Sequence, residues 1–284
     1  MSFMYYGGKS KIADKIISYF PAHTLYVEVF GGSAEILFRK KPAKAEVYND
    51  LDDGLCAIFQ CLYEPKLKKE LIEMLETFPP SRTFLEHLVK DNPKEIVRKA
   101  FRKLYLLRYS FNANCENFAA FQAIDYNSPR LKGFDFKVLE NISKRKIIIE
   151  NQDFRKLLPR FDKKHSLIYL DPPYYDIRQR YEYSFEEQDH LDLLEIINSL
   201  EQATWILSYN NHLTIREWYK KYHIIEESWR YSFNFTFKIR NDSGIRTELL
   251  ISNKPFKQWN IYNSYNQSLT DFLSLEQEEE VKQT

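Results

Sequence analysis

Two kinds of apolar pattern alternate along the chain. Short runs rich in Val, Ile, Leu and Tyr predict buried strands, and they occupy residues 25–30, 45–48, 146–150, 166–170 and 204–209. Stretches with apolar residues three or four positions apart predict helices, and they occupy residues 10–20, 33–40, 186–200 and 213–222. Strands that alternate with helices predict an α/β fold with a doubly wound, mostly parallel sheet.

Two segments depart from this alternation. The last two apolar runs, residues 224–239 and 246–253, flank the turn sequence Asn-Asp-Ser-Gly and predict a C-terminal antiparallel hairpin. From residue 55 to about 109 the spacing is mostly helical, and prolines interrupt it at Pro65, Pro79, Pro80 and Pro93. We therefore expect one domain formed by residues 1–54 and 146–266, a mainly helical insertion at 55–145, and an acidic, disordered tail at 267–284.

The charge of the chain is unevenly distributed. Residues 86–165 hold 18 Lys and Arg but 10 Asp and Glu, so the rest must carry −7 to give the overall +1. A basic middle is typical of a segment that binds a polyanion, although an ordinary charged helical face has the same composition.

Composition also narrows the class of protein. The chain has no apolar run near the ~20 residues of a membrane helix, its first twenty residues lack a signal-peptide core, and its three cysteines are too few and too irregularly spaced for a disulfide framework or zinc site. We expect a soluble, cytoplasmic protein without a metal or membrane association, acting as a monomer or weak dimer.

The sequence Asp171-Pro172-Pro173-Tyr174 directly follows the predicted strand at 166–170. Proline ends a strand and stiffens the turn, so a carboxylate, a carbonyl and an aromatic ring are presented where open α/β sheets bind ligands. Asp171 and the Pro172 carbonyl can each accept one hydrogen of an exocyclic amino group, and Tyr174 can stack on a base. This arrangement suits methyl transfer to an adenine amino group, but a plain strand-to-loop exit with an aromatic lid explains the tetrapeptide equally well.

A second group of residues suits a cofactor. The strand at 25–30 is followed by Gly31-Gly32 and a helix, a geometry that lets a ligand approach backbone amides. Asp50 follows Gly31 by 19 residues, where an acidic side chain accepts ribose hydroxyls, and Glu28 could hold an ammonium group. The pattern lacks the three spaced glycines of a dinucleotide fold, and Phe3 stands where a phosphate loop needs glycine. S-adenosylmethionine fits these residues.

The order of these motifs resembles that of the Dam-like, alpha-group adenine-specific DNA methyltransferases over roughly residues 4–253. The motifs are Tyr-Tyr-Gly-Gly-Lys at 5–9, Tyr-Val-Glu-Val-Phe-Gly-Gly-Ser at 26–33, Asn-Asp at 49–50 and Asp-Pro-Pro-Tyr at 171–174. The resemblance implies a Rossmann-like methyltransferase fold with a target-recognition insertion. Two residues depart from the family pattern: Val29 replaces a usual proline and Ala34 a common glycine.

The resemblance also assigns roles by position. It implies that Tyr5, Lys9, Asp50 and Asp171 contact S-adenosylmethionine, that Glu28, Phe30 and Gly31 line its pocket, and that Asp171, Pro172, Pro173 and Tyr174 hold a flipped adenine. Flipping is required because the amino group cannot reach the cofactor from inside the stack. The expected partner is double-stranded DNA, and the basic middle offers candidate contacts at Arg98, Arg102, Lys103, Arg108, Tyr109, Asn112 and Asn114.

Three other functions fit the same pattern. The same scaffold could methylate adenine in RNA or the amino group of cytosine, although aspartate rather than serine at position 171 favours adenine. The chain could also be a DNA-binding module without turnover, for which Val29 and Ala34 are the indications. A measurement of cofactor binding by calorimetry would separate this module from the enzymes.

Overall fold

A computed structural model describes residues 9–110, 115, 118, 145–176, 185–230 and 245–257. The predicted cofactor contact Tyr5, the candidate DNA contacts Asn112 and Asn114, the hairpin turn at 241–244 and the expected tail at 267–284 lie outside the described residues.

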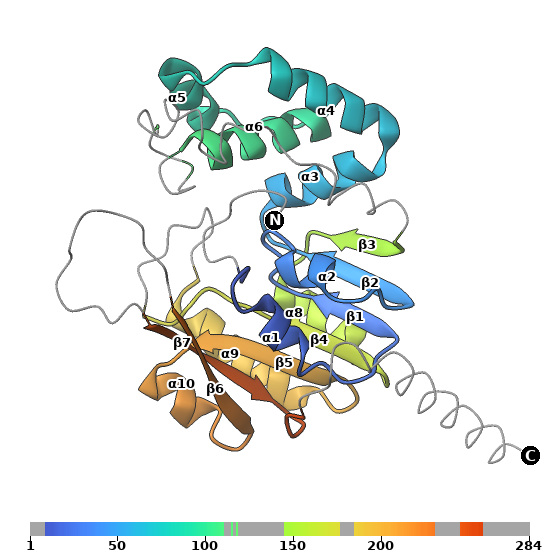
Figure 1. The fold of residues 1–284 in the computed structure, drawn as a ribbon, viewed down its shortest axis with the longest axis vertical. Coiled ribbons are helices and arrows are strands. Elements are labelled where there is room, and N and C mark those ends of the chain that lie inside the picture. Colours follow the sequence, from blue (N-terminus) through green and yellow to red (C-terminus); the bar gives the residue numbers. More distant parts are fainter. Residues whose placement is uncertain are drawn as a thin grey trace, which may run out of the picture.

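Within the described residues, seven strands form one sheet in the order β3-β2-β1-β4-β5-β7-β6 (Figure 1). The strands are β1 (Leu25–Glu28), β2 (Ala45–Asn49), β3 (Ile147–Glu150), β4 (Ser166–Leu170), β5 (Thr204–Asn210), β6 (His223–Arg230) and β7 (Ile245–Ser252). Neighbours from β3 to β5 are parallel, whereas β7 is antiparallel to both β5 and β6. The predicted fold class, a mostly parallel doubly wound sheet with a C-terminal antiparallel hairpin, is confirmed.

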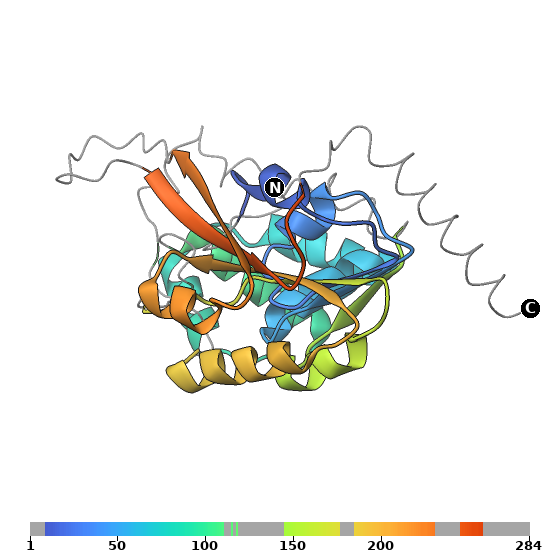
Figure 2. The same cartoon turned by 90° about the horizontal axis from the view of Figure 1, so that it is seen from below.

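Alternate residues of the central strands face two different layers, because side chains point to opposite sides of a strand. On one side, Tyr26 and Tyr169 pack with α1 (Ala13–Ile17) and α2 (Glu35–Arg39). On the other, Ile168 packs with α8 (Phe154–Leu157), the 3-10 turn η4 (Leu158–Phe161), α9 (Glu187–Ser199) and α10 (Leu213–Trp218). Figure 2 shows α1 and α2 above the sheet and α8, α9 and α10 below it.

The helical segment forms a layer beyond the β3 edge of the sheet (Figure 1). It contains α3 (Asp53–Tyr63), α4 (Pro65–Thr77), α5 (Arg82–Lys90) and α6 (Ile96–Tyr109), and α6 contacts the other three. Proline separates the helices as predicted, since Pro65 is the first residue of α4 and Pro93 lies between α5 and α6. The apolar core continues from the α1–α2 side of the sheet into this layer without a break.

Two details of the first and middle segments differ from the sequence prediction. Helix α1 starts at Ala13, with Ile12 in the N-cap position, whereas the pattern predicted a helix from residue 10. The pattern also missed α8, whose N-cap Asp153 accepts a hydrogen bond from the amide of Arg155 (2.8 Å). A four-residue helix is too short to establish a 3.6-residue period.

Among the described helices, none is both long and apolar enough to cross a bilayer.

Candidate active site

Asp171 stands directly after β4, where the carboxyl ends of the parallel strands meet. All five residues of β4 are buried, so the strand is a rigid base for the turn that follows. The side chain of Asn210, at the end of β5, accepts a hydrogen bond from the amide of Tyr175 (3.1 Å) and donates one to its carbonyl (3.1 Å). These two bonds fasten the Asp-Pro-Pro-Tyr turn to the neighbouring strand.

Lys9 brings a buried ammonium group against this turn. Its Nζ lies 2.6 Å from Asp171 Oδ1, 2.8 Å from the Tyr174 hydroxyl and 3.2 Å from Glu248 Oε1. The carbonyl of Lys9 accepts hydrogen bonds from the amides that open α1, which holds the backbone of Lys9 in place. The predicted cofactor contact at Lys9 is thus accompanied by an ion pair with Asp171 that the sequence did not indicate.

Burial governs the charges in this cluster. Burial raises the pKa of Asp171 to about 6, with the Lys9 charge opposing the rise and the Glu248 charge adding to it. Burial by itself would lower the pKa of Lys9, but Asp171 and Glu248 raise it well above its usual 10.5. At neutral pH, therefore, Lys9 is charged and Asp171 is ionised.

The cofactor side of the site is built on the Gly31-Gly32 turn between β1 and α2. The amide of Gly31 donates to the Asn49 carbonyl (2.8 Å), and the amide of Gly32 donates to Asp50 Oδ2 (2.8 Å). Asp50 Oδ1 accepts the amide of Asp52 (2.9 Å). Burial raises the pKa of Asp50 to about 6, and the Asp52 charge adds to the rise. The structure thus brings Asp50 to the glycine turn, at the place that the sequence spacing predicts.

Glu28 lies under this turn and is buried. Its carboxyl accepts a hydrogen bond from the Tyr26 hydroxyl (2.9 Å), but burial raises the pKa of Glu28 to about 8. The charge of Lys40 already opposes this rise, so Glu28 would ionise fully at neutral pH only beside a further cation. This is compatible with the predicted contact to an ammonium group.

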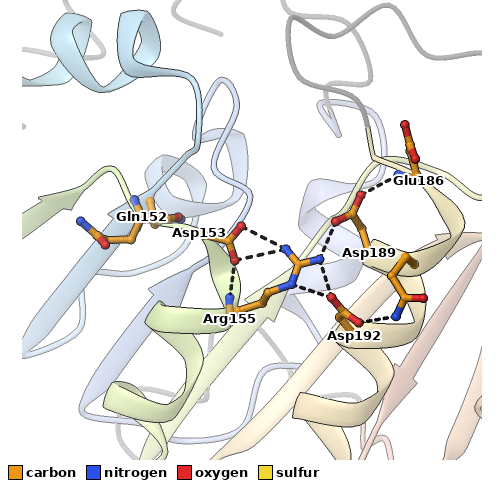
Figure 3. Close-up of polar contacts among 8 residues, drawn as sticks. Gln152, Asp153, Arg155, Glu186, Asp189 and Asp192 are labelled. Carbon is orange, nitrogen blue, oxygen red and sulfur yellow. Dashed lines mark hydrogen bonds and ion pairs between the residues drawn. The ribbon is translucent and has the colours of Figure 1, made fainter.

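Phe30, which follows β1, packs against the rings of Phe154 and Phe185, and these two rings also contact each other. The Phe30 centroid lies 5.7 Å from that of Phe154 and 5.8 Å from that of Phe185. Figure 3 shows Arg155 between Asp153, at the start of α8, and the carboxylates of α9. Its guanidinium contacts Asp153 (3.0 Å) on one side, and Asp189 (2.5 Å) and Asp192 (2.7 Å) of α9 on the other. The Arg155 guanidinium thus binds three carboxylates, and its ion pairs with Asp189 and Asp192 join α8 to α9.

A family model matches most of the chain, including Lys9, Asp50 and Asp171. The family model MethyltransfD12, described as D12 class N6 adenine-specific DNA methyltransferase, matches residues 5–233. The chain belongs to this family. The assignment confirms the resemblance to adenine-specific DNA methyltransferases that the motifs predicted. Among solved structures, the chain is similar to the crystal structure of SMU.776, described as a candidate methyltransferase complexed with SAH. That likeness has a TM-score of 0.38 and 13% identity over 86% of this chain and 48% of that one, so the chain spans about half its length.

The two departures from the family pattern lie in the backbone at the end of β1. Val29 is buried and its amide donates to the Tyr169 carbonyl (3.1 Å), a bond that proline cannot make. Ala34 has a φ of 55°, in the left-handed region that costs a non-glycine residue about 1–2 kcal/mol. Glycine would adopt this backbone angle without that cost. Neither residue contributes a polar side chain to the cofactor edge.

The structure corrects two of the predicted DNA contacts. Lys103 is buried, and its ammonium pairs with the carboxylate of Asp52. Tyr109 is buried as well, with its ring 4.6 Å from that of Tyr105. Because α6 lies at the centre of the helical layer, these side chains face other helices and cannot reach a phosphate or a base edge as placed.

The three predicted arginines of the D12-class chain differ in exposure. Arg98 is exposed, with a guanidinium nitrogen 3.7 Å from Asp91. Arg102 donates to the carbonyls of Leu88 (2.8 Å) and Val89 (3.2 Å) at the end of α5, so part of its capacity is used within the protein. Arg108 is half-buried, and its guanidinium lies 5.3 Å from the ring centre of Tyr109. Arg98 is thus the best placed of the three for a phosphate contact.

Two further polar residues at the site were missed. Glu248 stands in a predicted strand, residues 246–253, and Asn210 directly follows another, residues 204–209. Their contacts with the Asp-Pro-Pro-Tyr turn depend on β5 lying between β4 and β7. One signal was present for Glu248: it is a charged residue within an apolar strand, and a buried charge needs a partner. Among the described residues, no three His, Cys, Asp or Glu side chains gather as a metal site would require.

Proposed function

We propose that this D12-class chain transfers a methyl group from S-adenosylmethionine to N6 of adenine in DNA, after the target nucleotide has rotated out of the duplex. The arrangement of Asp171 supports the proposal most. Its Oδ1 pairs with Lys9, whereas its Oδ2 accepts no hydrogen bond from any described residue. A carboxylate with one oxygen fixed and the other available is suited to receive an amino group in a defined orientation.

The chemistry of an adenine amino group calls for such an acceptor. Its nitrogen is a weak nucleophile because the lone pair is delocalised into the ring. When Asp171 Oδ2 and the Pro172 carbonyl each accept one amino hydrogen, the nitrogen moves towards tetrahedral geometry and its developing positive charge is stabilised. With a pKa of about 6, Asp171 is ionised at neutral pH and can take up the proton that the amino group loses.

The acidic edge of the sheet suits S-adenosylmethionine, which supplies an electrophilic methyl group on a positively charged sulfur. Each oxygen of Asp50 accepts one backbone amide. Because a carboxylate offers about four lone-pair sites, two remain for the ribose hydroxyls. Glu28 ionises beside a cation, so it fits the ammonium of the amino-acid tail.

A methylation assay tests the proposal. Purified protein would be incubated with tritiated S-adenosylmethionine and chromosomal DNA that lacks N6-methyladenine, with RNA of mixed sequence as a parallel substrate. Nucleoside analysis is expected to show labelled N6-methyldeoxyadenosine. Labelled N4-methyldeoxycytidine or labelled RNA would favour one of the other amino-group reactions. Binding of cofactor and DNA without transfer would indicate a binding module.

Asp50→Asn is expected to weaken S-adenosylmethionine binding by roughly 1–3 kcal/mol, because hydrogen bonds to a charged acceptor become bonds to a neutral one. Calorimetric titration measures the change. Asp53→Asn is the matched control, since Asp53 is a neighbouring carboxylate that pairs with Lys99 (2.7 Å). Equal affinity of the Asp50→Asn and parent proteins would place the ribose elsewhere.

Arg98→Glu is expected to weaken binding to DNA of every sequence and to reduce the slope of log affinity against log salt by about one, because a phosphate contact and its released counterion are lost. Fluorescence anisotropy with a labelled duplex at several salt concentrations measures the slope. Lys220→Glu is the control, an exposed cation that follows α10. Equal slopes for Arg98→Glu and Lys220→Glu would remove Arg98 from the DNA-binding surface. Arg102 is unsuitable for this test because its replacement would also disturb the end of α5.

A further inference from the structure

A buried carboxylate from the C-terminal hairpin lies inside the site. Glu248 belongs to β7, where it stands opposite Asn210 of β5 and Glu227 of β6. Its side chain is 1% exposed, and it follows residues 5–233, the range that the family model matches. A charge this deeply buried is costly unless it is paired and hydrogen-bonded, so its partners indicate what it does.

The first partner is Tyr174, the ring to which the target base is assigned. The Tyr174 hydroxyl lies 2.6 Å from Glu248 Oε1 and 2.7 Å from Oε2. Lys9 Nζ donates to the same hydroxyl oxygen from 2.8 Å, and it lies 4.8 Å from the ring centre. The hydroxyl of Tyr174 therefore gives its single proton to Glu248 and accepts one from Lys9. Two bonds at the far end of the ring fix the plane on which a base would stack.

The second partner is the ammonium that holds Asp171. Lys9 Nζ lies between Asp171 Oδ1 at 2.6 Å and Glu248 Oε1 at 3.2 Å. The hydroxyl of Ser208 also donates to Glu248, which anchors the carboxylate to β5. The negative charge of Glu248 raises the pKa of Asp171, after the larger effect of burial, and so counteracts Lys9. Glu248 thus influences both the position of Lys9 and the basicity of Asp171.

We propose that Glu248 is a positioning residue for methyl transfer, which orients the Tyr174 ring through its hydroxyl and the Asp171 carboxylate through Lys9. This role rests on the proposed function, since it assumes that Asp171 and Tyr174 receive the base. The contacts of Glu248 are with Lys9, Tyr174 and Ser208, so it acts through these residues. Its contribution should therefore appear in the rate of transfer and in the pH dependence, and not in cofactor affinity.

The test replaces Glu248 with glutamine and measures single-turnover methylation, with protein in excess over chromosomal DNA that lacks N6-methyladenine. We expect the transfer rate of Glu248→Gln to fall about 10- to 100-fold, the size of effect that follows from slight misplacement of reacting groups. The dissociation constant for S-adenosylmethionine should stay within about twofold of the parent value, because the ribose and the ammonium are assigned to Asp50 and Glu28, which Glu248 does not contact.

Glu227→Gln is the matched control. Glu227 is also a buried glutamate, on the neighbouring strand, but it pairs with Lys15 and Tyr19 and contacts neither Asp171 nor Tyr174. Its variant should keep the parent rate and the parent pH profile. An equal loss of rate in both variants would indicate damage to the hairpin and overturn the positioning role.

The pH profile gives a readout that a purely structural role would not move. Because the charge of Glu248 raises the pKa of Asp171, Glu248→Gln should shift the acid limb of the transfer rate to lower pH. A limb at the parent position, together with a parent transfer rate, would overturn the proposal. If Glu248→Gln behaves like the parent while Asp171→Asn is inactive, the inference about Glu248 fails and the proposed function stands. A parent protein that methylates no DNA would overturn both.

Tyr174→Phe keeps the inference testable if Glu248→Gln does not fold. It removes only the hydroxyl that joins the ring to Glu248 and Lys9, so it should also slow transfer without changing cofactor affinity. In the double variant, the loss should be smaller than the product of the two single losses, because both changes break one hydrogen-bonded unit. Full activity of Tyr174→Phe, or losses that multiply, would overturn the role assigned to Glu248 through Tyr174.

Discussion

Replacing Asp171 with asparagine is expected to leave a folded protein that binds S-adenosylmethionine and DNA but transfers methyl groups at less than about 1% of the parent rate, the loss typical when one preorganised polar group of a transition state is removed. The position of Lys9 explains why the loss of rate in Asp171→Asn should be large. Its ammonium lies 2.6 Å from one oxygen of the Asp171 carboxylate, so the amide that replaces this carboxylate must turn its oxygen towards Lys9. The NH₂ group of that amide then faces the amino group of the base and repels its hydrogens.

Three measurements separate this explanation from loss of fold. The melting temperature should fall by only a few degrees, because Glu248 still pairs with Lys9 at 3.2 Å. Calorimetry should show S-adenosylmethionine binding to Asp171→Asn. The parent enzyme should lose activity as the pH falls through about 6, since protonated Asp171 cannot accept the amino hydrogen. Turnover of the variant near the parent rate would remove Asp171 from the chemistry.

Most of the fold could be predicted from the sequence because its signals are local. Strand β4 has the predicted bounds, Ser166–Leu170, since a buried central strand is an uninterrupted apolar run that ends at proline. The helices of the insertion are divided at the prolines for the same local reason. Helix α8 was missed because four residues carry no period, and the strand order of the hairpin could not be read from pattern alone.

The sequence could name candidate residues where a motif is contiguous, but it could not predict contacts among segments that lie far apart in the chain. Asp171 and Asp50 follow strands, and the carboxyl ends of parallel strands meet at one edge, so their convergence followed from the topology. Lys9, Tyr174 and Glu248 come from three distant segments, and no spacing rule joins them. Lys103 shows the opposite error: its basic helix suggested a DNA-facing surface, but α6 is covered on several sides and turns this lysine inward to Asp52.

Gly31→Ala is expected to destabilise the protein by about 2–4 kcal/mol, the sum expected for overpacking of a rigid core and loss of a buried hydrogen bond. A Cβ at Gly31 would lie 2.2 Å from Cε2 of Tyr48. The Tyr48 ring is buried, packs 4.3 Å from Phe59, and donates its hydroxyl to the Gly32 carbonyl (2.8 Å). The ring is therefore held in place, and the glycine turn, whose Gly32 amide donates to Asp50, would have to shift. Urea denaturation of both proteins measures the change.

Two variants show whether Tyr48 is the cause. Gly54→Ala is the control, because its new Cβ would meet Lys103 Cβ at 3.0 Å and Asp52 Oδ1 at 3.1 Å, contacts that need shifts of only a few tenths of an ångström, in a helix that favours alanine. It should change stability by much less. Tyr48→Val removes the ring atoms that collide, so the added cost of Gly31→Ala should nearly vanish in that background, which is the non-additivity expected of residues in contact. An equal cost of Gly31→Ala in both backgrounds would show that the glycine is needed for backbone conformation and not for the close approach of Tyr48.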